Sequence, residues 1–297
     1  MFTLFGDLAY VQKMMITRFA PSPTGLLHLG HAYSAMLAYE TAQHAGGRFL
    51  LRMEDIDHGR CREEFEHAIY EDLAWLGLTW ETPVRRQSCC MDDYKAALDK
   101  LDSQGLLYPC FCTRKDIQAE ITQAAGAPHL VQNGPDGPIY PGICRHLSPK
   151  QRHQRIQSGE PYALRLNMER ALEIVGSSPL TWQDQEKGPL TATPEIFGDV
   201  VLARKDTPTS YHLSVTVDDH LQGITNVIRG EDLFAATHVH RLLQNLLGLN
   251  TPTYHHHELL SSPDGRRLAK RDRAETLRIL RESGMSPKQV RAQTPLN

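Results

Sequence analysis

The sequence predicts an α/β fold in which a parallel sheet is interrupted by an insertion. Short apolar runs at residues 17–20 and 48–53 have strand character, and a longer segment with helical periodicity follows each of them. A strand–helix–strand–helix order argues for parallel strands joined by right-handed crossovers. From about residue 110 to 189 the chain is rich in Pro, Gly and Gln and loses this periodicity, and the α/β pattern returns at residues 200–204. We therefore expect one main domain that carries an insertion.

The first two helices are predicted from their periodicity and from the glycines that follow them. The first should extend over about residues 28–45, because Gly46 and Gly47 come next and glycine can adopt the left-handed conformation that ends a helix. The second should end at Gly77, and its apolar residues recur at helical spacing: Phe65, Ile69, Leu73 and Leu76.

Two further elements are predicted after residues 200–204. Apolar residues alternate with polar ones, as in a strand with two different faces, at Tyr211, Leu213, Val215 and Val217. An amphipathic helix is predicted from the spacing of Val239, Leu242, Leu243 and Leu246.

Composition and charge exclude several classes of protein. The chain has 297 residues, a formal net charge of −3 and a pI near 6.6, so it lacks a uniformly basic surface for nucleic acid. No apolar run approaches the length of a membrane span, and residues 1–15 lack the basic start of a signal peptide. The six cysteines give no sign of an oxidising compartment. We expect a cytoplasmic protein with no membrane partner.

A candidate nucleotide site lies at the start of the first predicted helix. The tetrapeptide His28-Leu29-Gly30-His31 directly follows a Pro/Gly-rich turn. The N-terminal amides of a helix attract phosphate, and glycine lets the backbone approach it closely. The two histidines could donate hydrogen bonds to charge that develops as pyrophosphate leaves. We expect His28, Gly30 and His31 to bind ATP.

A basic run, RRLAKR at residues 266–271, lies far downstream of these histidines. Taken alone, such a run is a solvated surface segment. Two phosphate-binding elements on either side of an α/β core instead favour phosphate chemistry, in which this basic loop closes over the phosphates and stabilises the leaving pyrophosphate.

Three other clusters are interpreted as structural. The histidines at residues 255–257 are not expected to share a metal, because adjacent side chains of a strand point to opposite faces. Asp-Asp-His at residues 218–220 is interpreted as a turn, and Cys89 and Cys90 as plain thiols.

Four blocks of the chain resemble the glutamyl-tRNA synthetases. RFAPSPTG at residues 18–25, with the His-Leu-Gly-His tetrapeptide, resembles their opening, and LRMEDID at residues 51–57 resembles their next block. VIRGED at residues 227–232 resembles a third. RLAKR at residues 267–271 resembles a degenerate Lys-Met-Ser-Lys-Ser loop of class I synthetases, in which Lys270 keeps the second lysine. The resemblance implies a Rossmann-like catalytic domain with a zinc-binding insertion and a short helical C-terminal segment.

The resemblance also implies a division of the chain into segments. We expect an N-terminal extension at residues 1–15 and Rossmann-like halves at residues 16–109 and 193–260. The insertion, which would bind zinc and receive the acceptor, should occupy residues 110–192. The basic loop and a helical C-terminal segment should occupy residues 261–297.

By the same resemblance, five residues surround a glutamate substrate: Arg18, Ser22, Glu54, Tyr211 and Arg229. An arginine fork suits a carboxylate, and an acidic side chain suits an ammonium group. Glu54 is therefore the expected ammonium partner, and Arg18 and Arg229 are the expected carboxylate partners, with no assignment of either arginine to one carboxylate. In the structural alternative, both arginines pair with nearby acids such as Glu231, and Tyr211 belongs to the core.

One residue of this pocket departs from the family pattern. Four residues after Tyr211, on the same face of the predicted strand, glutamyl-tRNA synthetases usually present an asparagine, whereas this chain has Val215. Valine cannot hydrogen-bond the substrate, so the change can weaken glutamate binding without altering the chemistry.

A candidate zinc site consists of four residues: Cys110, Cys112, Tyr140 and Cys144. Zinc prefers four tetrahedral ligands, commonly thiolates and imidazoles. The spacing alone leaves three buried thiols as an equal alternative, whereas the resemblance implies zinc held by a Cys-x-Cys and a later Tyr-x-x-x-Cys. His129 or His146 could replace Tyr140 as the fourth ligand. Such a closed site would order the insertion.

The resemblance implies the transfer of glutamate to a tRNA in two steps. The chain ends soon after Lys270, before a helical anticodon-reading domain could fit. It is therefore most similar to short paralogues in the family, which activate glutamate without tRNA and esterify queuosine at the wobble position of tRNA(Asp). The expected partners are ATP with Mg²⁺, L-glutamate and queuosine-bearing tRNA(Asp), and we expect a monomer. Two alternatives remain: a truncated synthetase that charges the tRNA 3′ end, and a non-catalytic, zinc-stabilised tRNA-binding module.

Overall fold

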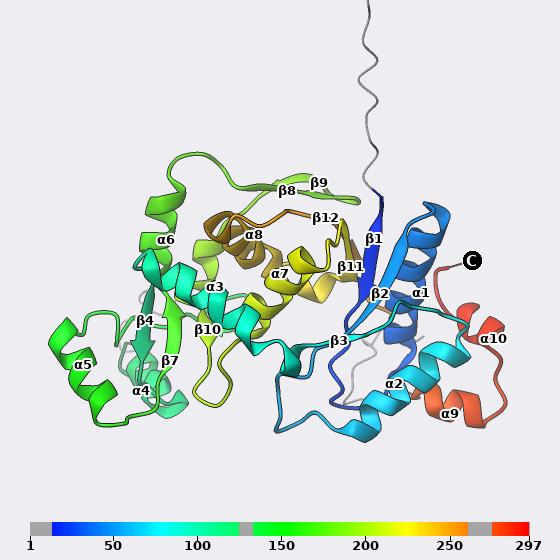
Figure 1. Cartoon of the computed structure of the whole chain (residues 1–297), viewed down its shortest axis with the longest axis horizontal. Helices are drawn as coiled ribbons and strands as arrows, with labels where there is room; N and C mark the ends of the chain where they lie inside the picture. Colours follow the sequence, from blue (N-terminus) through cyan, green and yellow to red (C-terminus); the bar gives the residue numbers. More distant parts are fainter. Residues whose placement is uncertain (1–13, 125–132, 261–274, 297) are drawn as a thin grey trace, which may run out of the picture.

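The structure, a computed structural model, describes residues 14–124, 133–260 and 275–296. Within these ranges the chain forms a mainly parallel sheet covered by helices and a smaller lobe built on an antiparallel sheet (Figure 1). The smaller lobe lies at one end of the molecule and the C-terminal helices lie at the other (Figure 1). The predicted α/β class with a parallel sheet is confirmed.

The first half of the main sheet alternates strands and helices. Its elements are β1 (Ile16–Phe19), α1 (Leu29–His44), β2 (Arg48–Met53), α2 (Glu63–Trp75) and β3 (Arg85–Arg86). β1 pairs in parallel with β2, and β2 pairs in parallel with β3. The two strands and two helices predicted for this half are confirmed.

Helix α1 packs closely on the sheet because the residues of its inner face are small. Four alanines of this face are fully buried: Ala32, Ala35, Ala38 and Ala42. The hydroxyl of Thr17 in β1 donates a hydrogen bond to the carbonyl of Ala38 at 2.8 Å. In the turn to β2, a Cβ on Gly47 would lie 2.2 Å from the carbonyl oxygen of Met15, so only glycine fits. This close packing fixes the N-terminus of α1 beside the end of β1.

The second half of the sheet consists of β11 (Asn226–Gly230), β12 (Thr253–His257), β8 (Thr181–Asp184) and β9 (Gly188–Thr191), in that order. The first three strands are parallel, and β9 is antiparallel to β8. β11 lies beside β1 (Figure 1), and the amide of Thr225 donates to the carbonyl of Ile16 at 3.0 Å. The two halves therefore meet where β1 and β11 lie side by side.

The segment predicted as a strand around Tyr211 is a helix, α7 (Tyr211–Leu221), so that prediction was wrong. Leu213 and Val217, one helical turn apart, pack into the main apolar core. Tyr211 and Val215, also one turn apart, line a cavity instead. A helix buried on two faces can place apolar residues at every second position, which mimics the alternation of a strand.

Helices α3 (Met91–Ser103) and α8 (Ala236–Leu247) pack around α7 in the centre of the molecule (Figure 1). The apolar face predicted for α8 is buried in the same core: Val239, Leu242, Leu243 and Leu246. This predicted amphipathic helix is therefore confirmed.

The smaller lobe comes mainly from the middle of the chain. Its sheet contains β4 (Leu107–Cys110), β7 (Ala163–Leu166) and β10 (Val201–Ala203), in the order β10-β7-β4. Around it lie α4 (Arg114–Ala124), β5 (Asn133–Gly134), β6 (Gly137–Pro138), α5 (Pro149–Gln157) and α6 (Met168–Val175). β8 and β9 fall within the predicted insertion, yet β8 pairs with β12 in the main sheet. The division into five segments stays a prediction.

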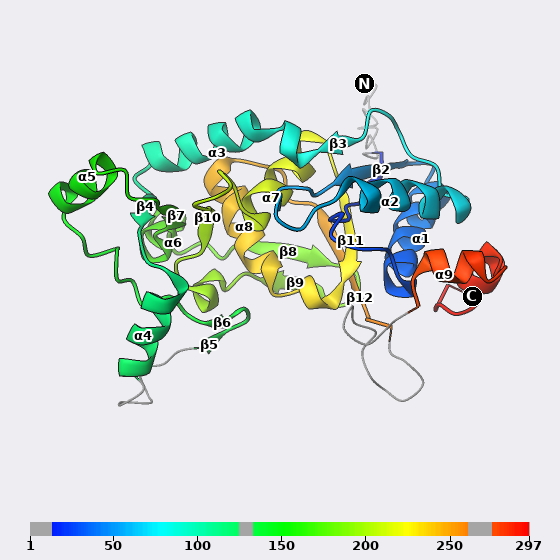
Figure 2. The ribbon, with the colours of Figure 1, turned by 90° about the horizontal axis from the view of Figure 1, so that it is seen from below.

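Two short helices, α9 (Leu277–Glu282) and α10 (Pro287–Arg291), lie beside α1 and α2 (Figure 2). Leu277, Leu280 and Val290 are buried in the core that α1 and α2 form with the sheet. Within the described ranges, no helix is long and apolar enough to cross a membrane.

Candidate active site

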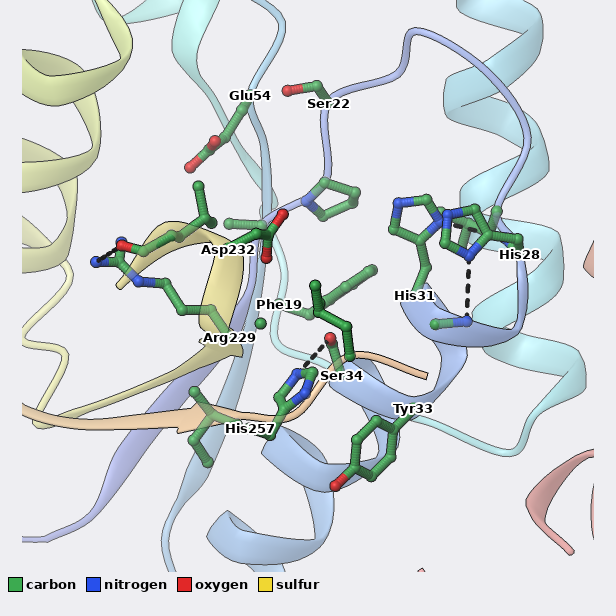
Figure 3. Close-up of a pocket in the computed structure, with 18 of the residues that line it drawn as sticks. Phe19, Ser22, His28, His31, Tyr33, Ser34, Glu54, Arg229, Asp232 and His257 are labelled. Carbon is green, nitrogen blue, oxygen red and sulfur yellow. Dashed lines mark hydrogen bonds between the residues drawn. The ribbon is translucent and has the colours of Figure 1, made fainter. Parts of the chain in front are cut away.

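A cavity of about 820 Å³ opens where β1, β2 and β11 end, beside the N-terminus of α1 (Figure 3). Parallel sheets bind ligands at the carboxyl ends of their strands, where the strand order changes direction. Here the chain passes from β1 to β2 on one side, while β11 lies on the other. The wall includes each predicted nucleotide or glutamate residue within the described ranges: Arg18, Ser22, His28, Gly30, His31, Glu54, Tyr211 and Arg229.

His28 and His31 cap the N-terminus of α1. Nδ1 of His28 accepts a hydrogen bond from the amide of Gly30 at 3.1 Å, and Nδ1 of His31 accepts one from the amide of His28 at 3.2 Å. Because both Nδ1 atoms accept, the neutral rings carry their protons on Nε2. A Cβ on Gly30 would lie 3.1 Å from Cε1 of His28, so glycine also provides room for this ring. The arrangement can present two N–H donors to an anion at the helix N-terminus.

Lys270, the predicted partner of these histidines, lies outside the described residues. The described residues on either side of the segment 261–274 lie close to the cavity. Leu260 lines the cavity, and Thr276 forms an isolated antiparallel bridge with His28. Both flanks of the basic run therefore lie beside the cavity.

Arg229 is 6% exposed and forms no ion pair with an acid in the described parts of the chain. Its Nε donates to Nε2 of His256 at 3.2 Å, its Nη2 to the hydroxyl of Thr237 at 2.8 Å and its Nη1 to the hydroxyl of Tyr211 at 3.3 Å. Burial and the charge of Arg229 lower the pKa of His256 to about 4, so this ring is neutral. The alternative pairing with Glu231 is not observed. A buried, uncompensated cation in a cavity wall is suited to bind a carboxylate.

Arg18, the other predicted carboxylate partner, already has an acidic partner. Its Nε and Nη2 donate to the carboxylate of Asp219 at 3.0 and 3.4 Å, and its Nη1 donates to the carbonyl of Ile228 at 3.3 Å. Burial raises the pKa of Asp219, but the guanidinium groups of Arg18 and Arg52 outweigh it and lower the pKa overall. The structural alternative for Arg18 is thus partly correct, with Asp219 in place of Glu231. Of the two arginines, Arg229 is the one without an acidic hydrogen-bond partner among the described residues.

Glu54 and Ser22 lie on the same side of the cavity, opposite His257 and Ser34 (Figure 3). Nη2 of Arg52 donates to Oε1 of Glu54 at 3.1 Å. Burial raises the pKa of Glu54 even though Arg52 lies beside it. A substrate ammonium group would favour the ionised carboxylate, which agrees with the role predicted for Glu54.

Tyr211 and Val215 lie on the same wall, as expected from their spacing, although through a turn of α7 and not along a strand. Burial raises the pKa of Tyr211 to about 12, so its hydroxyl is protonated at neutral pH. Val215 is 2% exposed and offers no polar atom. Tyr211 therefore belongs to the cavity wall and not to the core alone.

A set of buried charges next to the cavity was not predicted from the sequence. Residues 218–220 lie within the last turn of helix α7, so their interpretation as a turn between elements was wrong. Asp218 accepts from Nε of Arg85 at 2.7 Å, and Asp219 accepts from Nη1 of Arg52 at 2.8 Å. The sequence did contain a signal for this network. Asp218 and Asp219 directly follow an apolar segment, and Arg52 lies inside an apolar strand. Charges buried in such segments need partners of opposite charge.

A second missed group contains His257, Ser34 and Tyr33, all on the cavity wall. Nδ1 of His257 lies 2.8 Å from the carbonyl of Glu258, to which it can donate, so Nε2 can accept from the hydroxyl of Ser34 at 2.7 Å. His256, the preceding residue, contacts Arg229 instead. The two histidines thus contribute separately to this region.

Three of the four predicted metal ligands form a cluster in the smaller lobe. The Sγ atoms of Cys110, Cys112 and Cys144 lie within 4.8 Å of one another. The hydroxyl of Tyr140 lies 3.4 Å from Sγ of Cys110 and 3.6 Å from Sγ of Cys112. Tetrahedral zinc with Zn–S bonds of about 2.3 Å needs donor atoms roughly 3.5–4 Å apart. The cluster could therefore bind a metal, and the four side chains fit zinc.

The alternative fourth ligands fit less well. His146 is exposed and is not part of the cluster, and His129 lies outside the described residues. The amide of Cys144 donates to the Tyr140 hydroxyl at 2.8 Å, which fixes this oxygen beside the thiols.

Residues 14–293 match the family of class I tRNA synthetases (E and Q), over the catalytic domain. The chain belongs to this family. The glutamyl-Q tRNA(Asp) synthetase of Rhodobacter capsulatus is 50% identical over 93% of this chain and 98% of that protein. The corresponding protein of Symbiobacterium thermophilum is 40% identical over 93% of this chain and 84% of its own length.

Longer members of the family match over about half of their length. The glutamate–tRNA ligase of Aquifex aeolicus is 38% identical, and the alignment covers 91% of this chain and 54% of the ligase. The crystal structure of the glutamate–tRNA synthetase from Elizabethkingia anophelis superposes with a TM-score of 0.75 at 29% identity, over 88% of this chain and 53% of that chain. These similarities agree with the class I catalytic fold predicted from the sequence blocks.

Proposed function

We propose that the chain activates L-glutamate with ATP and transfers it to queuosine at the wobble position of tRNA(Asp). The observation that carries the proposal is the 50% identity to the Rhodobacter capsulatus protein named glutamyl-Q tRNA(Asp) synthetase, over 98% of that protein. The uncompensated charge of Arg229 in a wall that also contains Glu54 supports an amino acid with a second carboxylate as substrate. We also propose that the enzyme is monomeric and cytoplasmic.

In the first step, an oxygen of the substrate α-carboxylate attacks the α-phosphorus of ATP, and the bond to pyrophosphate breaks. His28 and His31 would donate from Nε2 to phosphate oxygens at the N-terminus of α1, where Gly30 keeps the backbone close. Lys270 would stabilise the departing pyrophosphate. Mg²⁺, bound with ATP, would neutralise part of the phosphate charge.

The amino acid would lie across the cavity from the histidines. Glu54 would pair with its ammonium group, Arg18 and Arg229 would hold the carboxylates, and Ser22 and Tyr211 would complete the wall. These side chains act through positioning and charge stabilisation, which can account for most of the acceleration in such a reaction.

In the second step, a hydroxyl of the queuosine cyclopentenediol attacks the carbonyl carbon of glutamyl-adenylate. The hydroxyl oxygen forms the new ester bond, the bond between the carbonyl carbon and the phosphate oxygen breaks, and AMP and the hydroxyl proton leave. The protein's part in this step is to hold the mixed anhydride in position for the attack.

Transfer of radiolabelled glutamate tests the proposal. The enzyme is incubated with glutamate, ATP and tRNA pools that contain or lack queuosine, and the label is mapped by nuclease digestion. We expect label on the anticodon fragment of queuosine-containing tRNA(Asp) only. Label on the 3′ adenosine of both pools would identify a short charging synthetase, and no label with no ATP–pyrophosphate exchange would identify a non-catalytic binding module.

The cluster in the smaller lobe is proposed to hold one structural zinc ion through Cys110, Cys112, Tyr140 and Cys144. Purified protein is then expected to contain about one zinc per chain, and Cys112→Ser to remove it and lower the thermal midpoint. The measurement is metal analysis together with thermal denaturation. Cys89→Ser, at an exposed thiol outside the cluster, is the matched control and should keep its zinc. Unaltered protein that lacks zinc, and whose melting is insensitive to chelator, would contradict the assignment.

A further inference from the structure

Three residues from separate parts of the chain form a buried hydrogen-bonded chain that ends at Arg229. Asp184 ends strand β8, His256 lies in β12 and Arg229 lies in β11. Oδ2 of Asp184 lies 2.7 Å from Nδ1 of His256, and Nε2 of His256 lies 3.2 Å from Nε of Arg229. The side chains of Asp184 and His256 have no exposed surface, at 0% each. Water therefore does not compete for these contacts.

The direction of each hydrogen bond follows from the groups involved. Nε of Arg229 can only donate, so Nε2 of His256 must accept and cannot carry a proton. The neutral imidazole therefore carries its proton on Nδ1 and donates it to the carboxylate of Asp184. Thr237 agrees with this order, because its hydroxyl accepts from Nη2 of Arg229 at 2.8 Å and can donate to Nε2 of His256 at 3.2 Å.

The remaining oxygen of Asp184 holds the carboxylate in a single orientation. Oδ1 accepts from the backbone amides of Glu186 and Lys187 at 3.0 and 3.1 Å. The side chain cannot rotate without breaking these bonds, so Oδ2 remains directed at His256. Asp184 thus selects the ring tautomer that accepts from Arg229.

We propose that Asp184 and His256 are positioning residues for glutamate binding: they fix Nε of Arg229 so that its Nη1 end stays available to a substrate carboxylate. The inference rests on the proposed function, in which Arg229 binds glutamate. At the cavity end, the contacts of Nη1 are long, 3.3 Å to the Tyr211 hydroxyl and 3.4 Å to His240, so a carboxylate can replace one of them. The contacts of Nε and Nη2 therefore hold the guanidinium in place, while a substrate carboxylate can replace a contact of Nη1.

Asp184→Asn tests the proposal because it reverses one hydrogen bond without changing the shape of the side chain. The amide oxygen must face the amides of Glu186 and Lys187, so the NH₂ group faces Nδ1 of His256. This ring then carries its proton on Nε2, where it opposes the N–H of Arg229. We expect KM for glutamate in ATP–pyrophosphate exchange to rise by about tenfold or more, and KM for ATP to change by less than about twofold.

The tautomer itself is read by ¹⁵N NMR of histidine-labelled protein, with the signals of His256 assigned from His256→Gln. Unaltered protein should show the Nδ1–H tautomer at pH 7, and Asp184→Asn should show Nε2–H. The matched control is Asp199→Asn, which neutralises another buried aspartate that also accepts from a backbone amide; it should leave both KM values unchanged.

An Nε2–H tautomer in the unaltered protein would overturn the hydrogen-bonded chain, even if Asp184→Asn does not fold. A tautomer change with an unaltered KM for glutamate would overturn its role in positioning Arg229. Failure of the proposed function is distinguishable from both, because unaltered protein would then lack glutamate-dependent exchange while its NMR spectrum still reports the tautomer.

Discussion

Replacement of Arg229 by leucine is expected to lower kcat/KM for glutamate in ATP–pyrophosphate exchange by about 10²- to 10³-fold, which corresponds to roughly 3–4 kcal/mol. The guanidinium is buried and has only neutral hydrogen-bond partners among the described residues, so a bound carboxylate would be its first directly bonded anion within this part of the chain. Leucine removes this attraction and leaves the carboxylate desolvated. Steady-state exchange at varied glutamate and ATP measures the effect, which should fall on glutamate and not on ATP.

The fold should tolerate this change. A buried cation without an acidic partner is costly to the folded state, and its replacement by an apolar side chain is often neutral or stabilising. Arg229→Lys should give an intermediate loss, because an ammonium keeps the charge without the fork. Arg48→Ala, at an exposed ion pair with Glu81 at the start of β2, is the matched control and should exchange normally. Exchange by Arg229→Leu within about threefold of the unaltered enzyme would overturn the assignment of this residue.

The parts of the fold that depend on local sequence could be predicted. Gly47 and the apolar run that follows it mark the turn into β2, and His28 and Gly30 mark the opening of α1, because each signal acts over a few residues. The second half needed information from across the chain. The period of α7 was misread because Leu213 faces the core while Val215 faces the cavity, and no local property separates these two environments.

The same limit applies to the polar network of the site. The five residues predicted around glutamate line one cavity. The resemblance did not predict the buried residues that hydrogen-bond to them. Asp219 compensates Arg18, which lies 201 positions away in the sequence. Asp184 holds His256, 72 positions away, against Arg229. Asp184 lies inside the predicted insertion, so only the pairing of β8 with β12 brings it to the site. The sequence pattern does not reveal which strands pair when they lie far apart in the chain, as β8 and β12 do.

A buried carboxylate outside the site provides the second large expected effect. Asp72 in α2 is fully buried, and neither of its oxygens has a hydrogen-bond partner in the described parts of the chain. Nη2 of Arg281 in α9 is 3.7 Å from Oδ1 of Asp72 but only 3.1 Å from the carboxylate of Glu71. Burial raises the pKa of Asp72 to about 6, because the nearby arginines do not compensate for lost hydration. The ionised Asp72 carboxylate therefore destabilises the folded state at neutral pH.

Asp72→Asn is expected to stabilise the protein at pH 7.5 by about 2–3 kcal/mol, since roughly two pKa units at 1.4 kcal/mol each separate the folded from the unfolded carboxylate. The raised pKa means that the folded state holds the Asp72 proton more tightly, so the contribution of Asp72 to the stability of the unaltered protein falls as pH rises from about 4 to 6, and the loss is complete above that range. Denaturant unfolding of unaltered protein and of Asp72→Asn at pH 4.0 and 7.5 measures the effect. The gain in the free energy of unfolding should be close to zero at the lower pH. Glu71→Gln, at the adjacent exposed acid, should change stability by less than about 0.5 kcal/mol at either pH. An equal gain at both pH values would show that amide packing, and not relief of a buried charge, causes the stabilisation.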